Sequence, residues 1–397
     1  SKDVLEDHPL PSLRRMVAPV GDLYFAVSSN NGEKVIDYFC KMPGISRILD
    51  QGENKASVVL QSGIQADLLV GHPQSYGALL QHFTGSKNHN IHLRTYALEK
   101  GHSLNESVKT ATEIEFYKIL DMDVPVPEVR EDTGEIEAAL EHQLPDLVEL
   151  KDIKGDLHLH SNFPISSPSH GPGVNSIEEI VKMGQNLGYG FVGISDHPLG
   201  ISTTSEKEKI EWVRKRTKFI QQIRQKAEKT KSIRVLNGLE IDILGDGSLS
   251  VPQQGLEMLD FCIAGIHSSH RKDITKRLIS ALNSPHIDII SHPTNRLLNE
   301  RDSSEADWPE IFKVAARNNK LLEINAFPNR LDLRDDLVRL ALEYGVKFVI
   351  NTDAHKIEQM DNMKFGVAVA RRGWATKKDI LNTWDWTKFA DWFNIKS

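Results

Sequence analysis

Side chains that can hold a metal ion recur at regular places in the C-terminal part of the chain. Each of seven short apolar runs carries a histidine or a carboxylate, most often at its end. They are His158, His160, His197, Glu240, His267, His292, Glu323, Asp353 and His355. A single histidine is more often a structural residue than a ligand, but repetition over seven runs predicts a metal centre.

The mixture of nitrogen and oxygen donors indicates the kind of metal and its chemistry. Imidazoles and carboxylates without thiolates favour Zn, Mn or Fe, whereas Mg and Ca prefer sites made of oxygen alone. More than six candidate ligands exceed the needs of one ion, so we expect two or three divalent ions. Clustered divalent ions lower the pKa of a bound water and neutralise charge on phosphate oxygens. The residues therefore predict a metal-dependent phosphoesterase.

The apolar runs themselves predict the elements that position these side chains. They read as strands, with room for a helix between most pairs. Their ranges are 155–160, 190–197, 235–241, 261–267, 287–292, 321–325 and 346–353. Parallel α/β architectures gather active-site residues at the carboxyl ends of the strands. We therefore predict a parallel barrel or open α/β sheet over residues 153–397.

The first 121 residues have a different pattern, typical of a mixed sheet with helices. Strands are predicted at 21–27, 56–60 and 65–70, and a helix at 33–41. Two further helices are predicted at 76–83 and 86–100, with Ser75 as an N-cap and Gly101 as a stop. A segment rich in Pro and Glu then predicts an extended linker over 122–152, including a short helix at 135–142.

Composition limits the class of protein. The hydrophobic content of 39% and the net charge of −7 are ordinary for a globular chain, and they argue against a uniformly basic surface for nucleic acid. No apolar run approaches the roughly 20 residues needed to cross a bilayer. The two cysteines lie far apart. We expect a cytoplasmic protein with no membrane partner, whose oligomeric state the sequence leaves open.

Several of the ligand-type residues stand in motifs that resemble the PHP (polymerase and histidinol phosphatase) domain. The matching residues are His158-Leu-His160-Ser161, Ser195-Asp-His197, Glu240, His267, His292-Pro293 and Asp353-Ala-His355. The resemblance implies a distorted seven-stranded barrel with three metal ions. Glu240, His197 and Asp353 are then the expected catalytic residues.

The same resemblance implies which side chains share each ion. The first ion is expected at His158, His160, Glu240 and Asp353, and the second at Glu240, His267 and His292. His197 and His355 would hold the third, with one more ligand from the loop after His160. The sequence of that loop departs from the family pattern. His170 is the candidate for the missing ligand of the third ion.

Two arginines near the predicted site are candidates for binding the substrate phosphate. Arg296 follows His292 by four residues, and Arg330 follows Asn325 by five. Either guanidinium could form a fork with phosphate oxygens. His270 and His286 are predicted to be structural or solvent-facing.

The N-terminal part resembles family X DNA polymerases. The resemblance runs through Ser12-Leu-Arg-Arg15, Gly21-Asp22, Ala66-Asp67-Leu68, His82-Phe-Thr-Gly-Ser-Lys-Asn-His-Asn90 and Leu104-Asn-Glu106. It implies a partial palm over 1–70 and a thumb over 71–121. It also implies a residual polymerase site and contacts to DNA or nucleotide. The site would comprise Ser12, Arg15, Asp22 and Asp67, and the contacts Phe83, Gly85, Lys87, Asn90 and Arg94.

Polymerase chemistry is nevertheless doubtful in this palm. The family pairs two aspartates as Asp-x-Asp, but here the pair reads Asp22-Leu23-Tyr24. A phenol with a pKa of about 10 cannot replace a carboxylate that bridges two Mg²⁺ ions. Pro11-Ser12 also stands where the family has Gly-Ser, which removes a backbone N–H. Magnesium would matter only for a residual polymerase activity.

The sequence therefore predicts a phosphoesterase that acts on DNA 3′ ends, as a 3′→5′ exonuclease with possible processing of abasic sites or 3′-phosphates. The expected partner is gapped or single-stranded DNA. Three alternatives stay open: a functional gap-filling polymerase, a small-molecule phosphatase of the histidinol phosphate type, and a non-catalytic DNA-binding scaffold.

Overall fold

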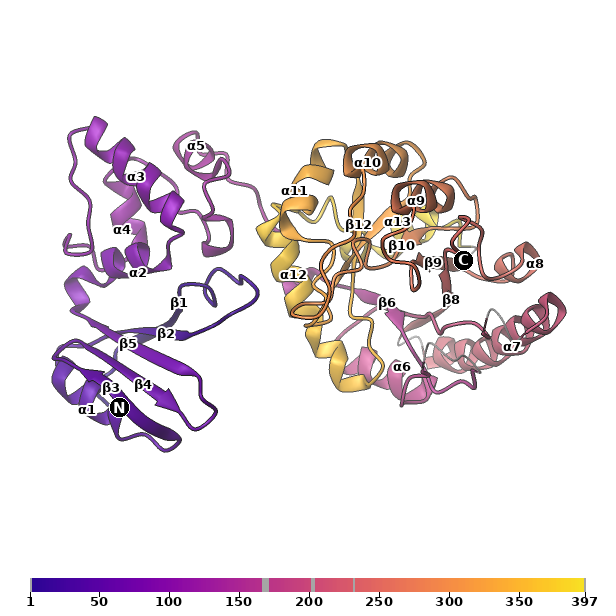
Figure 1. Ribbon diagram of the computed structural model, residues 1–397, viewed down its shortest axis with the longest axis horizontal. Helices are drawn as coiled ribbons and strands as arrows, with labels where there is room; N and C mark the ends of the chain where they lie inside the picture. Colours follow the sequence, from indigo (N-terminus) through magenta and orange to yellow (C-terminus); the bar gives the residue numbers. More distant parts are fainter. Residues whose placement is uncertain (1, 166–170, 201–203, 231–232, 396–397) are drawn as a thin grey trace. The chain divides into compact units, whose positions relative to one another are not determined.

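A computed structural model describes residues 2–165, 171–200, 204–230 and 233–395 of the chain (Figure 1). The chain divides into two compact units, residues 1–145 and 146–397. The division falls inside the segment predicted as a linker. Among the described residues, no helix is both long and apolar enough to cross a membrane.

The first unit contains a five-stranded mixed sheet, with strand order β1-β2-β5-β4-β3. The strands are β1 (Glu6–Leu10), β2 (Leu23–Ser28), β3 (Ile45–Gln51), β4 (Lys55–Leu60) and β5 (Gln65–Gly71). Helix α1 (Gly32–Cys40) packs on the sheet through Val35 and Ile36. The strand pairs are antiparallel except β2 with β5, which are parallel and place Tyr24 opposite Asp67.

Two edge strands of this sheet were not predicted. The sequence of β1 contains Pro9, which cannot donate a ladder hydrogen bond and so weakens the strand pattern. Strand β3 is exposed along nearly its whole length, so it lacks the alternation of apolar and polar residues that marks a half-buried strand.

A helical layer completes the first unit. Its helices are α2 (Tyr76–Thr84), α3 (Lys87–Glu99), α4 (Glu113–Lys118), α5 (Glu135–Leu140), η1 (Pro73–Ser75) and η2 (Pro127–Val129). Ser75 immediately precedes α2, and Gly101 follows α3 with a φ of 81°. Met122, Ile136 and Ala139 are buried against these helices. The early part of the predicted linker is therefore packed into the first unit.

The second unit is built on a seven-stranded parallel sheet, with strand order β12-β11-β10-β9-β8-β7-β6. The strands are β6 (Gly155–Leu159), β7 (Phe191–Ile194), β8 (Arg234–Asp242), β9 (Phe261–Gly265), β10 (Ile289–Ile290), β11 (Leu321–Asn325) and β12 (Lys347–Asn351). A bridge between Leu159 and Ala354 brings the two edges of the sheet together. The sheet is thus a nearly closed barrel, which confirms the predicted α/β fold.

All seven predicted strands are present, although β10 is much shorter than predicted. It ends at Ile290, and His292 has a positive φ of 26°, a conformation that leaves the strand path. The residues after Ile290 therefore form a loop at the rim of the barrel.

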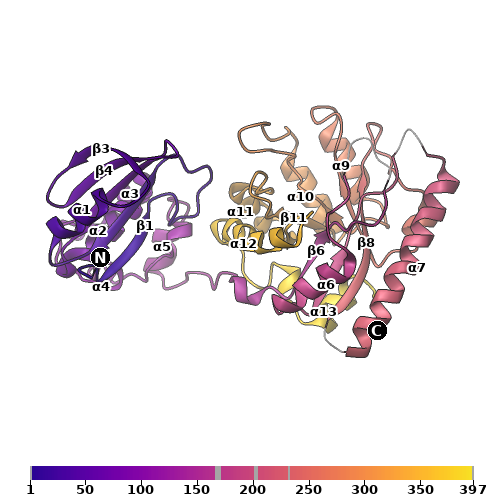
Figure 2. The same ribbon diagram turned by 90° about the horizontal axis from the view of Figure 1, so that it is seen from below.

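Helices surround the barrel (Figures 1 and 2). They are α6 (Ile177–Asn186), α7 (Glu206–Thr230), α8 (Gln253–Leu256), α9 (Ile274–Leu282), α10 (Trp308–Arg317), α11 (Asp335–Glu343), α12 (Met363–Arg372) and α13 (Trp386–Trp392). Short turns of 3-10 helix lie at η3 (Leu150–Asp152), η4 (Ile357–Asn362) and η5 (Leu381–Thr383). Most of these helices bury one apolar face against the outer surface of the sheet.

A separate apolar cluster fills the barrel interior at the amino ends of the strands. Leu236, Phe261, Ile263 and Val349 belong to it, together with Phe389 from α13. A Cβ atom on Gly238 would lie 2.3 Å from the ring of Phe261, so only glycine leaves room for that ring inside the barrel.

Candidate metal centre

The side chains that point into the barrel are apolar at the amino ends of the strands and charged nearer the carboxyl ends. Residues two apart in a strand point to the same face. Leu236 of β8 belongs to the apolar plug, and Glu240 lies four residues further along the same face. Leu321 is followed in the same way by Glu323 in β11. In these two strands, an apolar residue at the base thus supports a glutamate nearer the carboxyl end.

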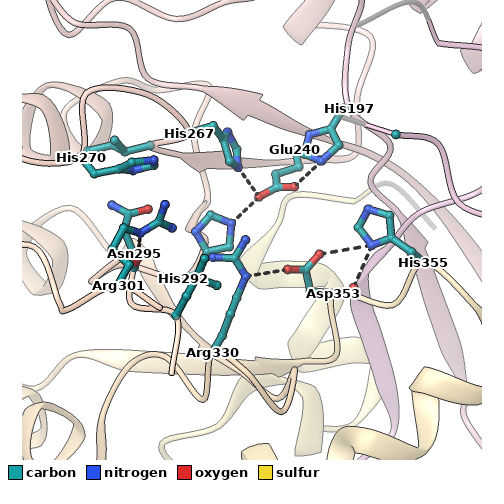
Figure 3. Close-up of a pocket in the computed structure, with 13 residues that line it drawn as sticks. His197, Glu240, His267, His270, His292, Asn295, Arg301, Arg330, Asp353 and His355 are labelled. Carbon is teal, nitrogen blue, oxygen red and sulfur yellow. Dashed lines mark hydrogen bonds and ion pairs between the residues drawn. The ribbon is translucent and has the colours of Figure 1, made fainter. Parts of the chain in front are cut away.

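Glu240 is the centre of the resulting cluster (Figure 3). Four histidine Nε2 atoms lie within 3.3 Å of its carboxylate, and Nε2 of His160 lies 3.6 Å from Oε2. To Oε2 the distances are 3.0 Å from His158 and 3.3 Å from His197, and to Oε1 they are 2.8 Å from His292 and 3.1 Å from His267. Glu240 is buried, as are His158, His197 and His292.

Asp353 forms the second focus of the cluster. Its Oδ1 lies 3.2 Å from Nε2 of His160, 3.5 Å from Nε2 of His158 and 3.8 Å from Nδ1 of His355. Its Oδ2 lies 3.3 Å from Nε of Arg330. The residue has a φ of 54°, in the left-handed region, immediately beyond the end of β12.

Two further carboxylates orient histidines through the Nδ1 atom, while the Nε2 atom faces Glu240. Glu323 makes a 2.7 Å hydrogen bond with Nδ1 of His158, and Asp242 makes a 2.7 Å hydrogen bond with Nδ1 of His267. In each case the Nε2 atom is left pointing toward Glu240. Metal-ligating histidines characteristically have such a carboxylate partner, which fixes the ring and its tautomer.

The electrostatics of the cluster keep its two central carboxylates ionised. Burial raises the pKa of Glu240, but the nearby His158, His197 and His267 oppose this and hold that pKa well below its usual value. The pKa of Asp353 is shifted in the same direction. Burial raises this pKa, but His158 and a hydrogen bond to His160 outweigh burial and hold the pKa well below its usual value. Ionised carboxylates beside imidazole nitrogens are suitable donors for divalent cations.

The donor atoms also meet the spacing that a metal requires. Three groups have ligand atoms within 4.8 Å of one another. They are His158-His160-Glu240-Asp353, His197-Glu240-His267, and His160-His197-His355. In addition, Nδ1 of His160 and Nδ1 of His292 are buried without a hydrogen-bond partner among the described residues. The residues present therefore fit a cluster of metal ions.

These groups can be compared with the ligand sets expected from the sequence. The first set is reproduced in full. In the second, His197 stands with Glu240 and His267, while His292 contacts the same Oε1 atom of Glu240 as His267 does. In the third, His160 joins His197 and His355. His170 lies outside the described residues. The assignment of ligands to individual ions stays a prediction.

A cavity of about 330 Å³ opens above the cluster. Arg330 lines it, and Nη1 of Arg330 is buried without a hydrogen-bond partner among the described residues. Arg296 is not among the lining residues, because its Nε donates to the carbonyl of Arg330 at 2.7 Å and an Nη2 donates to that of Leu331. Arg296 supports the loop that carries Arg330.

The cavity includes side chains that the sequence did not single out. His270, expected to be structural or solvent-facing, lines the cavity, as do Asn295 and Arg301. None of the three belongs to a recognisable spacing, since all lie in irregular loops after β9 and β10. Asp242 was also missed, although its place two residues after Glu240 on the same strand face was a usable signal.

The carboxylates of the first unit have a different environment. Asp67 is 2% exposed, and its carboxylate accepts hydrogen bonds from Ser57 Oγ and, at 2.9 Å, from Gln65 Nε2. Burial and then the charges of Asp67 and Asp22 raise the pKa of Tyr24, so its phenol stays neutral. The pair Asp22 and Tyr24 thus supplies one carboxylate where the sequence comparison expects two.

Arg14 and Arg15, in the segment that resembles the polymerase motif, are already paired. Nε of Arg15 lies 3.0 Å from Glu131, and an Nη1 of Arg15 donates to the carbonyl of Thr84. Arg14 donates to both oxygens of Glu113, at 2.7 and 3.1 Å. Ser12 accepts a backbone hydrogen bond from Val17 within the turn that follows β1.

The predicted DNA-contact residues lie around the start of α3. Lys87 is exposed, Phe83 is half-buried, and Gly85 ends α2 with a φ of 71°. The amide of Asn90 bonds with Gln81 Nε2 at 2.8 Å and with the carbonyl of His82 at 2.7 Å. Arg94 lies 3.7 Å from Glu106. Of this set, Lys87 presents its charge most openly.

Comparison with known proteins supports both resemblances. The family model "PHP domain" matches residues 156–327, and the model "DNA polymerase beta thumb" matches residues 79–131. A Bacillus subtilis protein named "DNA polymerase/3'-5' exonuclease PolX" is 36% identical over 386 residues. That match covers 94% of this chain and 65% of the relative, so the chain spans somewhat less than two thirds of that relative's length.

A second group of relatives matches the C-terminal unit. A "Probable phosphatase" of Caldicellulosiruptor saccharolyticus is 30% identical over 196 residues, covering 47% of this chain and 75% of the relative. A "Probable phosphatase" of Clostridium acetobutylicum is 26% identical over 212 residues, covering 50% of this chain and 78% of the relative. The chain belongs to the PHP-domain family, and its N-terminal unit is similar to the corresponding part of the Bacillus subtilis relative.

Proposed function

We propose that this protein is a metal-dependent phosphoesterase that removes nucleotides from DNA 3′ ends, as a 3′→5′ exonuclease, and that can process abasic sites or 3′-phosphates. The observation that carries the proposal is the buried cluster in which four histidines surround Glu240. The thumb-like segment and the Bacillus subtilis relative favour DNA as the substrate.

In this proposal, the three groups of donors named above hold two or three Mn, Zn or Fe ions. Bound divalent ions supply a hydroxide at neutral pH and offset negative charge on the phosphate. Glu323 and Asp242 position His158 and His267 for that task. Glu240, His197 and Asp353 are the proposed catalytic residues, which would hold the ions in position relative to the phosphate.

Arg330 is the side chain proposed to bind the scissile phosphate. Its Nε lies beside Asp353, and its Nη1 has no partner among the described residues, so the guanidinium can donate to a phosphate oxygen without breaking another bond. A charged hydrogen bond of this kind contributes about 1.5–3 kcal/mol. Substrate binding would thereby satisfy a buried donor.

The test is hydrolysis of 3′-labelled single-stranded and gapped DNA by the whole chain, after chelation and after addition of Mn²⁺ or Zn²⁺. We expect shortening from the 3′ end that depends on the metal, and no shortening by the His158→Ala/His160→Ala variant. Measurement of DNA binding by the same variant controls for loss of fold. Undiminished cleavage by the variant would refute the cluster as the catalytic centre.

A small-molecule phosphatase is the second candidate, favoured by the "Probable phosphatase" relatives of the C-terminal unit. Histidinol phosphate offered under the same conditions separates the two, because only a phosphatase releases phosphate from it faster than nucleotides from DNA. A scaffold protein would bind DNA and cleave neither substrate.

We further propose that nucleotide transfer by the palm is lost or very weak. Tyr24 replaces a carboxylate, and Arg15 is held by Glu131 and the Thr84 carbonyl. A primer-extension assay on gapped DNA with Mg²⁺ or Mn²⁺ is expected to give no efficient filling. Efficient filling would establish the alternative, a functional polymerase.

A further inference from the structure

A second cavity adjoins the one above the metal centre. It has a volume of about 450 Å³, compared with about 330 Å³ for the first, and both are lined by His270 and Arg301. Because the two cavities share these side chains, a ligand longer than the first cavity can continue into the second.

The wall between the two cavities is held in place by hydrogen bonds. Ser304 Oγ donates to the carbonyl of His270 at 2.7 Å, and the Ser304 N–H donates to the carbonyl of Thr294 at 2.7 Å. Nε of Arg301 donates to the carbonyl of Asn295 at 2.7 Å. The loops after β9 and β10 are thus tied together, which makes the second cavity a preformed site.

Polar atoms near the junction lack partners. Nδ1 of His270 and Oδ1 of Asn295 are buried and have no hydrogen-bond partner in the part of the chain that the structure describes. A buried polar atom without a hydrogen-bond partner destabilises the fold, so a bound polar ligand or water is expected there. Figure 3 shows His270, Asn295 and Arg301 grouped on the side of the cavity opposite His355.

The charges of the second cavity suit a phosphate group. Arg271 and Arg301 both line it, and the described residues provide no ion pair for Arg271 or for the Nη atoms of Arg301. Asp302 and Glu305 also line the cavity; like Arg271 they are exposed, so these three side chains can turn either into the cavity or toward solvent. Arg301 is half-buried and fixed by its Nε bond, so its positive charge stays directed at the junction.

We propose that the second cavity binds the phosphodiester next to the one that is cleaved, through Arg271, Arg301 and His270. The preferred substrate is then a nucleotide chain with at least two consecutive phosphates, not a phosphomonoester of a small molecule. This inference rests on the proposed function and specifies its substrate class. Guanidinium forks are the usual recognition elements for such phosphate oxygens.

The test uses two probes that differ in the number of phosphates. One is the p-nitrophenyl ester of thymidine 5′-monophosphate, with a single phosphodiester, and the other is a thymidylate trinucleotide, with two. With Mn²⁺ present, Arg271→Ala is expected to lower kcat/KM for the trinucleotide about tenfold, mainly through KM, as loss of one charged hydrogen bond implies. For the single ester the change is expected to stay below about twofold, since Arg271 lines only the second cavity.

Lys272→Ala is the matched control. Lys272 is an exposed cation next to Arg271 that does not line either cavity, so this variant should behave as wild type on both probes. Equal losses on the two probes in Arg271→Ala, or behaviour identical to Lys272→Ala, would overturn the second subsite while leaving the phosphoesterase in place. If the wild-type protein cleaves neither probe, the proposed function itself fails.

Discussion

Two carboxylates in each unit of the chain have contrasting surroundings. In the barrel, Glu240 and Asp353 are surrounded by imidazole nitrogens, and carboxylates behind the histidines keep those nitrogens turned inward. In the first unit, Asp67 is hydrogen-bonded by Ser57 and Gln65, and Glu113 is paired with Arg14 and Arg130. We expect Glu240 and Asp353 to take part in chemistry, and Asp67 and Glu113 to stabilise the fold.

The largest expected effect is on Glu240. Glu240→Gln keeps the shape of the side chain but removes the charge that four histidines share, so hydrolysis of 3′-labelled DNA should fall at least about a thousandfold. The control is Glu310→Gln, which changes an exposed glutamate on α10 and should leave the rate unchanged. A loss smaller than tenfold with a normal thermal transition would mean that the barrel carboxylate is not used in chemistry.

The next effect concerns Glu113 and the stability of the first unit. Burial raises the pKa of Glu113, but Arg130 and Arg14 outweigh it and bring the pKa to about 2 from 4.5. A carboxylate with a lowered folded pKa stabilises the fold above its unfolded pKa, and this stabilisation is lost as the pH falls from about 4.5 toward 2. The shift corresponds to about 3 kcal/mol in order of magnitude.

Glu113→Gln should therefore speed hydrogen exchange in peptides from residues 76–140 at pH 7, and the difference from wild type should shrink at pH 3. Exchange in the barrel peptides is the internal control. A difference that is the same at both pH values would show that the ion pairs of Glu113 do not stabilise the first unit.

A smaller effect is expected at Glu323, which positions His158 and does not reach the substrate cavity. Glu323→Gln should weaken metal binding about 10–100-fold, in line with other carboxylates that orient a metal-bound histidine. Titration of the chelated protein with Mn²⁺ measures this directly, and excess Mn²⁺ should restore most of kcat. A kcat that stays low at saturating metal would contradict a purely positioning role.

The smallest effect is expected at Tyr24, in the sheet of the first unit. Tyr24→Phe removes the phenol oxygen from the place of the missing carboxylate and should change DNA hydrolysis by less than about twofold. The assay is the same 3′-end cleavage used for Glu240. A large loss would show that the palm takes part in hydrolysis, and the contrast between the two units would have to be abandoned.

The sequence was most informative where regular structure and chemistry coincide. Parallel strands bring their carboxyl ends together, so His158, Glu240 and Asp353 could be placed at one site from the pattern of strands alone. The register of β2 with β5 could not be derived in this way, nor could the edge strands β1 and β3, because exposure and Pro9 obscure their periodicity.

Loop residues were the hardest to place. Arg296 and Arg301 are five residues apart in the same loop, and nothing in their spacing shows that Arg301 faces the cavity while Arg296 binds backbone carbonyls. That distinction depends on the path of the loop, which is set by long-range contacts such as the hydrogen bond between Ser304 and the His270 carbonyl. Likewise, Met122 and Ile136 are buried only because distant helices surround a segment whose composition is typical of a linker.

The apolar cluster that fills the barrel interior determines how substrate and product can enter and leave the site. Phe261, Ile263 and Phe389 fill the interior beneath the metal centre, so the described residues leave no passage from the metal centre through that end of the barrel. A hydrolysed product must therefore leave on the side where the two adjoining cavities lie, which is also the side from which the substrate arrives. Product that leaves on this side obstructs the entry of substrate. Accumulating product is therefore expected to slow turnover by competing with substrate for access to the metal centre.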